Sequence, residues 1–313
     1  MQRKAICTIA SINYFAQITG LYATVKKYCP EVDFYLLLAD KNEDEKVLSE
    51  INKRAEGMEY LFVEDINIPD FSNLVKNYTV VDLNTSVKPF FMKWLLENKD
   101  IDKLLFMDSD TRLYHSPEVI YEALEDNSIV LTPHIASLNE NKETVLSKPD
   151  DFCKFGIFNL GFLGLKNDKN AMELLTWWAS KMHDKCKLDF ENGYAWDQKW
   201  LDFAPGLFEG VYVLKHIGCN VAFWNIQGRF ISEKNGEYFV NDEVPLIFYH
   251  FSHHRVKDRA NIISVEEPER NIPVTKRPDL VKLYEDYDNK LIEDNYFFFN
   301  AVENGYDLVF VVH

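Results

Sequence analysis

The sequence lacks several patterns that mark common protein classes. No apolar run approaches the roughly 20 residues that a helix needs to cross a bilayer. The start, MQRKAICTIASINYF, has a short basic stretch but no apolar core with a small-residue cleavage site, so we read it as a first strand and not as a signal peptide. No G-x-x-x-x-G-K-[ST] loop, G-x-G-x-x-G fingerprint, G-x-S-x-G elbow or H-E-x-x-H helix is present, which argues against several common enzyme classes. We expect a cytoplasmic protein, with peripheral attachment to the inner membrane face left open.

The sequence also has few cysteines and fewer basic than acidic residues. The cysteines are odd in number, never spaced as C-x-x-C, and therefore argue against a disulfide framework or a structural zinc site: Cys7, Cys29, Cys153, Cys186 and Cys219. The 34 basic residues face 50 acidic ones, a formal net charge of −16. Such a charge disfavours binding to nucleic acid or to an anionic membrane, because both need a positive face. An anionic small ligand would need a divalent cation or a few well-placed basic side chains.

The first half alternates strand-like and helix-like segments, which predicts an α/β fold with a mostly parallel sheet covered by helices on both faces. The expected strands are 4–11, 33–40, 58–65 and 103–108, and the expected helices are 14–30, 43–55 and 85–99. Ser116 is expected to cap a further helix with Pro117 at its first position. The second half is less regular, with a strand at 156–166, a helix at 170–186 and a strand at 244–252. We expect one α/β domain over residues 1–265 and a helical extension over 266–313, whose helix at 277–296 packs over the sheet or serves as an interaction arm.

The stretch KLLFMDSDTRLY places Asp108 and Asp110 directly after an apolar strand. In an extended segment, residues i and i+2 project to the same side, so the two carboxylates can address one point. Two oxygen donors suit Mg2+ or Mn2+, with water and phosphate oxygens in the remaining positions. Ligands of open parallel sheets bind at the carboxyl ends of the strands, where this pair would lie. The alternative is a solvated strand end at which Asp110 caps a turn.

A second apolar segment, PLIFYHFSHHRVKDR, ends in His250. Imidazole is a ligand for borderline ions such as Mn2+, and His250 is preferred because it ends the apolar run itself. His253 and His254 are expected in a mobile loop, beside a basic cluster that could neutralise phosphate, namely Arg255, Lys257 and Arg259. The alternatives are a boundary histidine and a solvated loop.

Two further motifs combine polar side chains with glycines or aromatics. In GIFNLGFLGL, glycines permit close backbone approach and Asn159 offers both a donor and an acceptor, although a β-bulge would explain the same pattern. In NGYAWDQKWLDF, Asp197 and Gln198 lie between Trp196 and Trp200, as suits a sugar with apolar faces and hydroxyl edges. An amphipathic helix that buries its tryptophans is the alternative.

Taken together, these segments resemble the GT-A nucleotide-sugar glycosyltransferases, in particular the retaining family 8 type that includes bacterial galactosyltransferases and glycogenin-like enzymes. The resemblance covers about residues 5–255 and rests on IASINYFA, NTSVKPFF, the D-x-D pair, N-x-G, the Asp-Gln pair and the H-F motif. It departs in the family's H-F-x-G-x-x-K motif, where His253 stands at the glycine position and Val256 at the lysine position. Ser11 stands where an acidic residue is often found.

The resemblance implies roles for particular residues. Those expected to contact the nucleotide sugar are Ala10, Ser11, Asn13, Tyr14, Lys88, Asp108, Ser109, Asp110, Asn159, Gly161 and His250. Mn2+ or Mg2+ is expected on Asp108, Asp110 and His250. Asp197 and Gln198 are the implied catalytic pair.

The implied activity is transfer of a sugar from a UDP-sugar to a hydroxyl of a glycan or other acceptor, metal-dependent and with retention of configuration, as in polysaccharide biosynthesis. The acceptor is expected near Trp224, Asn225 and residues 251–260. The sequence leaves open a nucleotidyltransferase, a sugar-nucleotide or glycan-binding protein without catalysis, and a structural α/β interaction domain. It does not indicate the oligomeric state.

Overall fold

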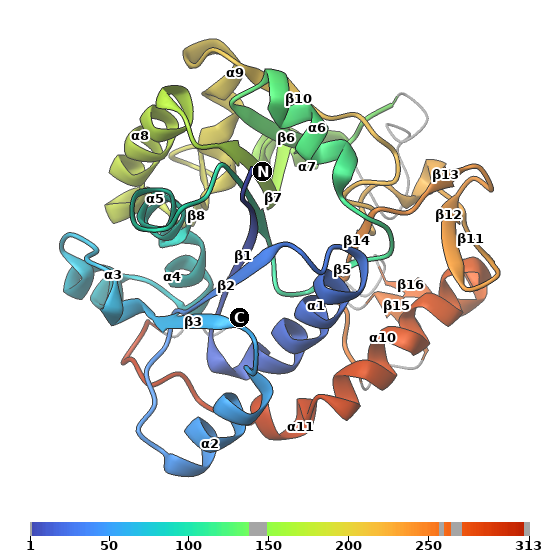
Figure 1. Ribbon diagram of the computed structural model, residues 1–313, viewed down its shortest axis with the longest axis horizontal. Helices are drawn as coiled ribbons and strands as arrows, with labels where there is room; N and C mark the ends of the chain where they lie inside the picture. Colours follow the sequence, from blue (N-terminus) through green and yellow to red (C-terminus); the bar gives the residue numbers. More distant parts are fainter. Residues whose placement is uncertain (1, 138–148, 257–259, 264–270, 310–313) are drawn as a thin grey trace.

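The computed structural model describes residues 2–137, 149–256, 260–263 and 271–309 (Figure 1). Its centre is a seven-stranded sheet in the order β10-β6-β7-β4-β1-β2-β3. The strands are β1 Lys4–Ala10, β2 Asp33–Leu38, β3 Glu59–Phe62, β4 Lys103–Met107, β6 Ile129–Pro133, β7 Phe158–Lys166 and β10 Val211–Val213. Neighbouring strands run parallel except at β7, which is antiparallel to both β4 and β6. The predicted α/β class with a mostly parallel sheet is confirmed.

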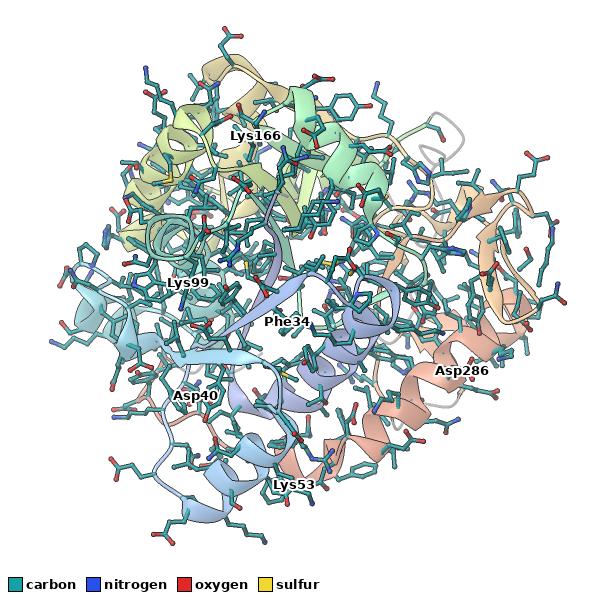
Figure 2. The ribbon with its side chains drawn as sticks, in the orientation of Figure 1. Phe34, Asp40, Lys53, Lys99, Lys166 and Asp286 are labelled. Atoms are coloured by element: carbon teal, nitrogen blue, oxygen red, sulfur yellow. The ribbon has the colours of Figure 1, made fainter. Side chains whose placement is uncertain are left out.

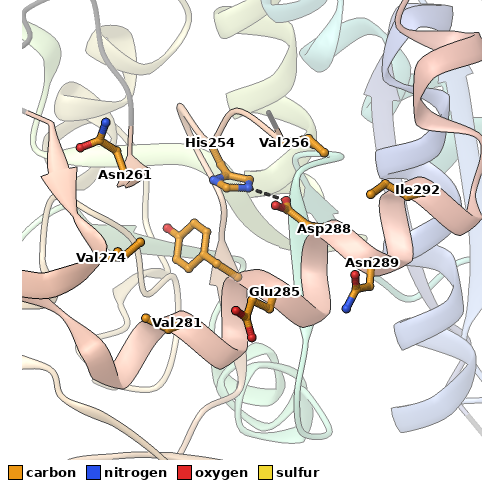
Figure 3. Close-up of a pocket in the computed structure, with 10 residues that line it drawn as sticks. His254, Val256, Asn261, Val274, Val281, Glu285, Asp288, Asn289 and Ile292 are labelled. Atoms are coloured by element: carbon orange, nitrogen blue, oxygen red, sulfur yellow. Dashed lines mark hydrogen bonds and ion pairs between the residues drawn. The ribbon is translucent and has the colours of Figure 1, made fainter. Parts of the chain in front are cut away.

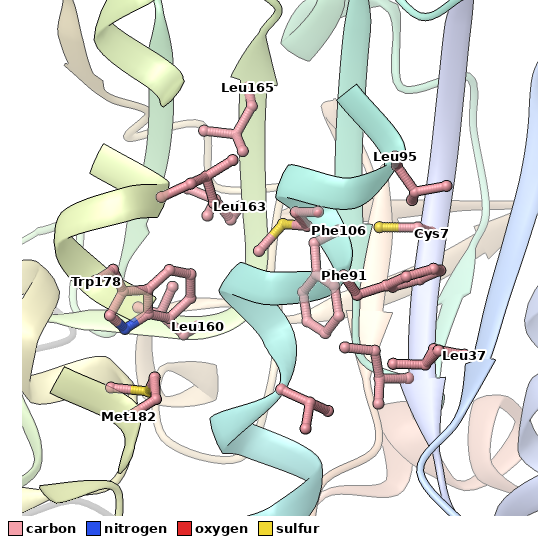
Figure 4. Packing of buried hydrophobic residues seen from close by; sticks show 14 of the residues in the cluster. Cys7, Leu37, Phe91, Leu95, Phe106, Leu160, Leu163, Leu165, Trp178 and Met182 are labelled. Atoms are coloured by element: carbon pink, nitrogen blue, oxygen red, sulfur yellow. The ribbon is translucent and has the colours of Figure 1, made fainter. Parts of the chain in front are cut away.

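Helices cover both faces of the sheet, as the continuous apolar strands predict. The helices are α1 Phe15–Tyr28, α2 Glu45–Arg54, α3 Phe71–Asn77, α4 Val80–Ser86, α5 Lys88–Asn98, α6 Glu118–Asp126, α7 Pro149–Phe155, α8 Lys169–Lys185, α9 Ala204–Leu207, α10 Val281–Glu293 and α11 Tyr296–Phe299. In Figure 1, α5 and α8 lie to one side of the sheet and α1 to the other. Each face of the sheet has its own hydrophobic core, and alternate residues of β1 point into one or the other. Cys7 packs in the core under α5 and α8, and Ile6 packs in the core under α1. Figure 4 shows Phe91 of α5 and Trp178 of α8 in the first of these cores.

Short strands surround the central sheet, and their pairing corrects one predicted strand. They are β5 Thr111–Leu113 with β14 Phe248–His250, β8 Leu188–Asp189 with β9 Tyr194–Ala195, β11 Ile231–Lys234 with β12 Glu237–Val240 and β13 Val244–Pro245, and β15 Asn261–Ile263 with β16 Ile272–Pro273. The single strand predicted over 244–252 is wrong, because β13 pairs with β12 and β14 pairs with β5. The predicted cap at Ser116 is also wrong by one residue. Pro117 is the N-cap of α6, and its carbonyl accepts from the backbone N–H of Ile120 at 2.9 Å.

The last long helix, α10, does not lie over the central sheet. Its buried residues Leu283, Tyr284 and Leu291 join a third cluster that includes Tyr249 and Phe251 of the β14 segment. The helix also packs against α1. The helix begins at Val281, because Pro278–Leu280 forms a separate 3-10 turn. The division at residue 265 stays a prediction.

After α11 the chain returns to the sheet. The red trace in Figure 1 passes beside α3, and Tyr306 packs edge-on against Phe71 of that helix with ring centroids 5.5 Å apart. Tyr306 and Leu308 are buried in the same core as α5 and α8. Among the described residues, no helix is long and apolar enough to cross a membrane.

Core packing around α5 gives a direct test of the fold. Phe91 is fully buried, so Phe91→Ala is expected to lower the free energy of unfolding by about 3–5 kcal/mol through lost burial and the cavity left behind. Val81→Ala, at a side chain that is 54% exposed, should change it by no more than about 0.5 kcal/mol. Urea denaturation of both variants measures the difference, and equal losses would contradict the packing described.

Candidate active site

Asp108 and Asp110 lie in a turn between β4 and β5. The backbone N–H and the hydroxyl of Thr111 both donate to the Asp108 carbonyl, at 3.0 and 2.7 Å. The two carboxylates do address one point, as predicted, but a turn and not an extended segment brings them together, and the chain then leads directly into β5. Strand β5 pairs antiparallel with β14 in a register that sets Thr111 opposite His250. This pairing brings His250 to the two aspartates.

The three side chains form a compact group of ligand atoms. His250 Nε2 lies 3.1 Å from Asp110 Oδ1 and 3.9 Å from Asp108 Oδ2, and all three ligand atoms are within 4.8 Å of one another. The imidazole is buried, whereas the side chains of Asp108 and Asp110 are 31% and 23% exposed. Two carboxylate oxygens and one imidazole nitrogen, open to solvent on one side, fit Mn2+ or Mg2+ with further positions left for a ligand.

The electrostatics of this group favour a cation. Burial would lower the pKa of His250, but Asp110 and Asp108 outweigh it and raise that pKa above its ordinary value. For Asp110 the signs are reversed: burial would raise its pKa, but the neighbouring His250 more than offsets this and leaves the pKa of Asp110 below its ordinary value. The negative potential that stabilises a proton on the imidazole also stabilises a metal ion at the same point.

Gly161 on β7 lies directly under the His250 ring. A Cβ atom at this position would be 2.4 Å from His250 Cε1 and 2.8 Å from Asn159 Oδ1, so only glycine leaves room for the ring. Its carbonyl accepts from the Asp108 N–H at 2.8 Å, and its N–H donates to Asn159 Oδ1 at 3.1 Å. The glycines of this strand are expected to permit a close approach to the backbone, and at Gly161 the group that approaches is the His250 ring.

A network of buried asparagine side chains lies next to Gly161 and His250. Asn159 Oδ1 accepts from Asn220 Nδ2 at 3.0 Å, and Asn225 Nδ2 donates to the carbonyls of Asn220 and His134 at 3.0 and 3.2 Å. The ring of Trp224 stands edge-on to that of His250, with centroids 5.2 Å apart. Asn225 is fully buried and Trp224 is only 6% exposed, so the Asn225 side chain has no surface for an acceptor, while an acceptor near Trp224 and residues 251–260 stays a prediction.

Lys88 joins the aspartate turn to the Asp-Gln pair. Its ammonium lies 3.3 Å from Asp108 Oδ1 and 3.0 Å from Asp197 Oδ2, and it donates to the Leu160 carbonyl at 3.0 Å. Burial alone would lower the pKa of Lys88, but the two carboxylates hold it well above its ordinary value. Burial raises the pKa of Asp197, and Lys88 offsets only part of that rise. The lysine and Asp197 are both buried, so this ion pair is fixed in the wall of the site.

The tryptophans around the Asp-Gln pair do not form an amphipathic α-helix. Asp197 precedes a 3-10 helix, Gln198–Phe203, and its carbonyl accepts from Trp178 Nε1 at 3.1 Å. Trp196 has a left-handed backbone, with φ of 50°, and donates through Nε1 to Asp82 Oδ1 at 3.0 Å. Gln198 is half-buried beside them.

The residues expected at the nucleotide end follow β1. Ala10 ends the strand and Ser11 is buried, while Asn13 and Tyr14 lie in a 3-10 turn, Ile12–Tyr14, in which the tyrosine is 44% exposed. Strand β1 is parallel to β4, so this turn and the aspartate turn lie at the same edge of the sheet. Ser109, between the aspartates, is buried, and its carbonyl accepts from Arg112 Nη1 at 3.2 Å.

The loop after His250 is partly ordered by α10. The side chain of His254 is 4% exposed, and its Nε2 lies 2.5 Å from Asp288 Oδ1, so the expectation of a mobile loop is wrong for this residue. Figure 3 shows this pair at a pocket of about 340 Å³ beside α10, whose lining includes neither Asp108 nor Asp110. His253 has a φ of 59°, the left-handed conformation that glycine adopts most easily, at the position where the family motif has glycine. Arg255 is exposed, and the other expected cations, Lys257 and Arg259, lie outside the described residues.

Comparison with known proteins identifies the fold. No family model matches the chain. The galactosyltransferase LgtC, solved with donor and acceptor sugar analogs, superposes with a TM-score of 0.54 over 92% of this chain and 95% of its own, at 16% identity. The glycosyltransferase GlyE of Streptococcus pneumoniae TIGR4 gives a TM-score of 0.51 over 97% of this chain and 66% of its own, at 15% identity. The chain therefore has the GT-A glycosyltransferase fold, as the resemblance implied.

Relatives by sequence carry no established function. The uncharacterized proteins YfnD and YfnF of Bacillus subtilis strain 168 are each 27% identical to this chain. The YfnD match spans 278 residues, 83% of this chain and 86% of YfnD, and the YfnF match spans 295 residues, 92% and 91%.

Gly161→Ala tests the contact between β7 and His250. The added methyl group is expected to displace the imidazole and to weaken Mn2+ binding at least tenfold, since one of three protein ligands is lost. Electron paramagnetic resonance of free Mn2+ during a titration measures this affinity. Gly206→Ala is the matched control, because its Cβ would meet no atom within 4 Å. Unchanged Mn2+ affinity in Gly161→Ala would show that His250 does not bind the ion.

His134 gives a prediction for acid stability. Burial lowers the pKa of His134 to about 4, well below its ordinary value of about 6.5, so protonation favours the unfolded chain. This contribution to stability is complete above about pH 6.5 and is lost as the pH falls toward 4. Between pH 7 and pH 5 the free energy of unfolding of the wild type should fall, and about 2 kcal/mol of that fall should come from His134. In His134→Asn the fall should therefore be smaller by about 2 kcal/mol, as measured by urea denaturation at the two pH values. An identical pH dependence in both proteins would contradict the assignment.

Proposed function

We propose that the protein is a metal-dependent glycosyltransferase that moves a sugar from a UDP-sugar to a hydroxyl of a glycan or similar acceptor, with retention of configuration. The observation that carries the proposal is the meeting of two groups at the carboxyl end of β4. One is the ligand set of Asp108, Asp110 and His250, and the other is the buried pair of Lys88 and Asp197. The GT-A fold and the sugar analogs bound to LgtC support this reading.

The electrostatic problem of such a reaction is the diphosphate that leaves. The chain carries a net charge of −16, so an anionic ligand must meet local positive charge. Asp108, Asp110 and His250 would hold Mn2+ or Mg2+, which when bound supplies the charge that stabilises the departing diphosphate. Lys88 adds a fixed positive charge at the same edge, preorganised by its two carboxylate partners.

Asp197 and Gln198 would act at the sugar. The carboxylate of Asp197 is buried and paired with Lys88, and its backbone carbonyl accepts from Trp178, so the carboxylate would have a fixed direction from which to accept bonds from sugar hydroxyls. Gln198 would lie near the reacting carbon, but an amide is a weak nucleophile. A displacement on one face of the sugar, through an oxocarbenium-like species, therefore suits these side chains better than a covalent glycosyl-enzyme.

Asp110→Asn tests the proposal. With Mn2+ present, UDP release from a panel of UDP-sugars is expected to fall at least a hundredfold in the variant, about 3 kcal/mol of transition-state stabilisation, and to stop when EDTA is added to the wild type. Asp100→Asn, at a side chain that is 84% exposed, is the control and should keep full activity.

Two results would change the assignment. Activity without metal, or full activity in Asp110→Asn, would overturn the metal site. Tight metal-dependent binding of UDP without turnover on any acceptor or on water would favour a sugar-nucleotide-binding protein instead.

A further inference from the structure

The segment 303–309, near the carboxyl end of the chain, crosses the ends of the first three strands. Asn304 Nδ2 lies 3.3 Å from Ser11 Oγ, just after β1, and 3.4 Å from the carbonyl of Ala39, just after β2. Tyr306 donates its hydroxyl to Glu64 Oε1 at 2.9 Å, just after β3. A segment far away in sequence is thus bonded to three consecutive strand ends at the edge that carries the aspartate turn.

Asp40 couples this segment to the turn after β1. It lies at the end of β2, where Figure 2 labels it, and is only 1% exposed. One carboxylate oxygen accepts from the Ile12 N–H at 3.0 Å, and the other accepts from the N–H groups of Gly305 and Lys41, both at 2.8 Å. The same buried carboxylate therefore fixes both the docked segment and the start of the turn that presents Asn13 and Tyr14.

Ser11 is the second point of coupling. Its hydroxyl accepts from Asn84 Nδ2 at 2.7 Å as well as from Asn304. Asn84 lies on α4. The amide of Asn304 thus completes a set of contacts that joins the turn after β1 to α4.

The docking is sterically tight at Gly305. A Cβ atom there would lie 2.0 Å from the Lys41 carbonyl oxygen and 2.8 Å from Lys41 Cγ. A backbone oxygen in the loop after β2 cannot move away as a flexible side chain can, so any larger residue must displace the segment. The fit selects one position for segment 303–309 against Asp40.

We propose that segment 303–309 is a positioning element for the nucleoside end of the donor site. It holds Ser11 and the turn Ile12–Tyr14 in the conformation that receives the nucleoside, and its docking is therefore linked to nucleotide affinity. This inference rests on the proposed function, because it takes the strand-end site to bind a nucleoside diphosphate.

The sheet order places the contacts of segment 303–309 on one side of the metal group. Strand β4 has β7, with Asn159 and Gly161, on one side and β1 on the other, followed by β2 and β3. The contacts of segment 303–309 described above all fall on the β1, β2 and β3 side. Displacing the segment should therefore weaken contacts to the nucleoside while the diphosphate and its metal ion stay bound.

Gly305→Ala separates the two ends. In isothermal titrations with Mn2+ present, its affinity for UDP is expected to fall about tenfold, whereas its affinity for inorganic diphosphate and for Mn2+ alone should match the wild type. Asn304→Ala, which removes the amide bonds without adding volume, should lower UDP affinity in the same direction by about threefold. The N–H of residue 305 donates to Asp40, and that of Val309 donates to the Tyr78 carbonyl at 3.1 Å. Faster hydrogen exchange of these two amides in Gly305→Ala would show that the segment is displaced.

Three outcomes overturn the inference. One is unchanged UDP affinity in Gly305→Ala with a displaced segment, and another is an equal loss for UDP and inorganic diphosphate, which would indicate general damage to the fold. The third is wild-type exchange protection in Gly305→Ala, which would contradict the tight fit. Failure of the proposed function looks different, because wild-type protein would then bind no UDP in a Mn2+-dependent way, or Asp110→Asn would bind it normally.

Discussion

Lys88 is bonded at once to Asp108 and Asp197, and much of the site depends on that arrangement. The lysine is buried, so neither the ammonium nor Asp197 could remain charged there without the other at acceptable cost. Because Lys88 is the first residue of α5, the ion pair also fixes that helix against the strand ends. A stability requirement and a fixed position for the ammonium beside the aspartate turn are thus met by the same three side chains.

Three residues near the candidate site have an irregular backbone. Trp196, Asn220 and His253 all adopt left-handed conformations that side chains other than glycine visit rarely. Each lies next to a residue of the site or of the network beneath it: Trp196 precedes Asp197, Asn220 bonds to Asn159, and His253 follows the β14 segment. Backbone strain of this kind persists only where the surrounding packing determines it, and it gathers at sites that must hold side chains in fixed directions.

Much of the central sheet could be predicted from sequence, because β1, β2 and β4 are continuous apolar runs and the strand-end rule then locates Asp108 and Asp110. What could not be predicted depends on contacts between distant segments. The split of residues 244–252 follows from pairing with two different strands, β12 and β5. Asn225 carries no local signal of its burial, and the double ion pair of Lys88 is set by tertiary packing alone. The segment around Gly305 that packs against Asp40 forms no helix or strand, so its sequence has no periodic pattern from which its position could be predicted.

The pairing of β5 with β14 has a consequence for how the protein acquires its site. Asp110 and His250 are 140 residues apart in the chain, and this short antiparallel ladder helps to bring them together. Such a distant pairing has a high entropic cost, because the chain between the two residues must lose its freedom before the contact is gained. An ion that needs both residues would bind the finished molecule and not its partly folded forms, so uptake of the ion would report that folding is complete.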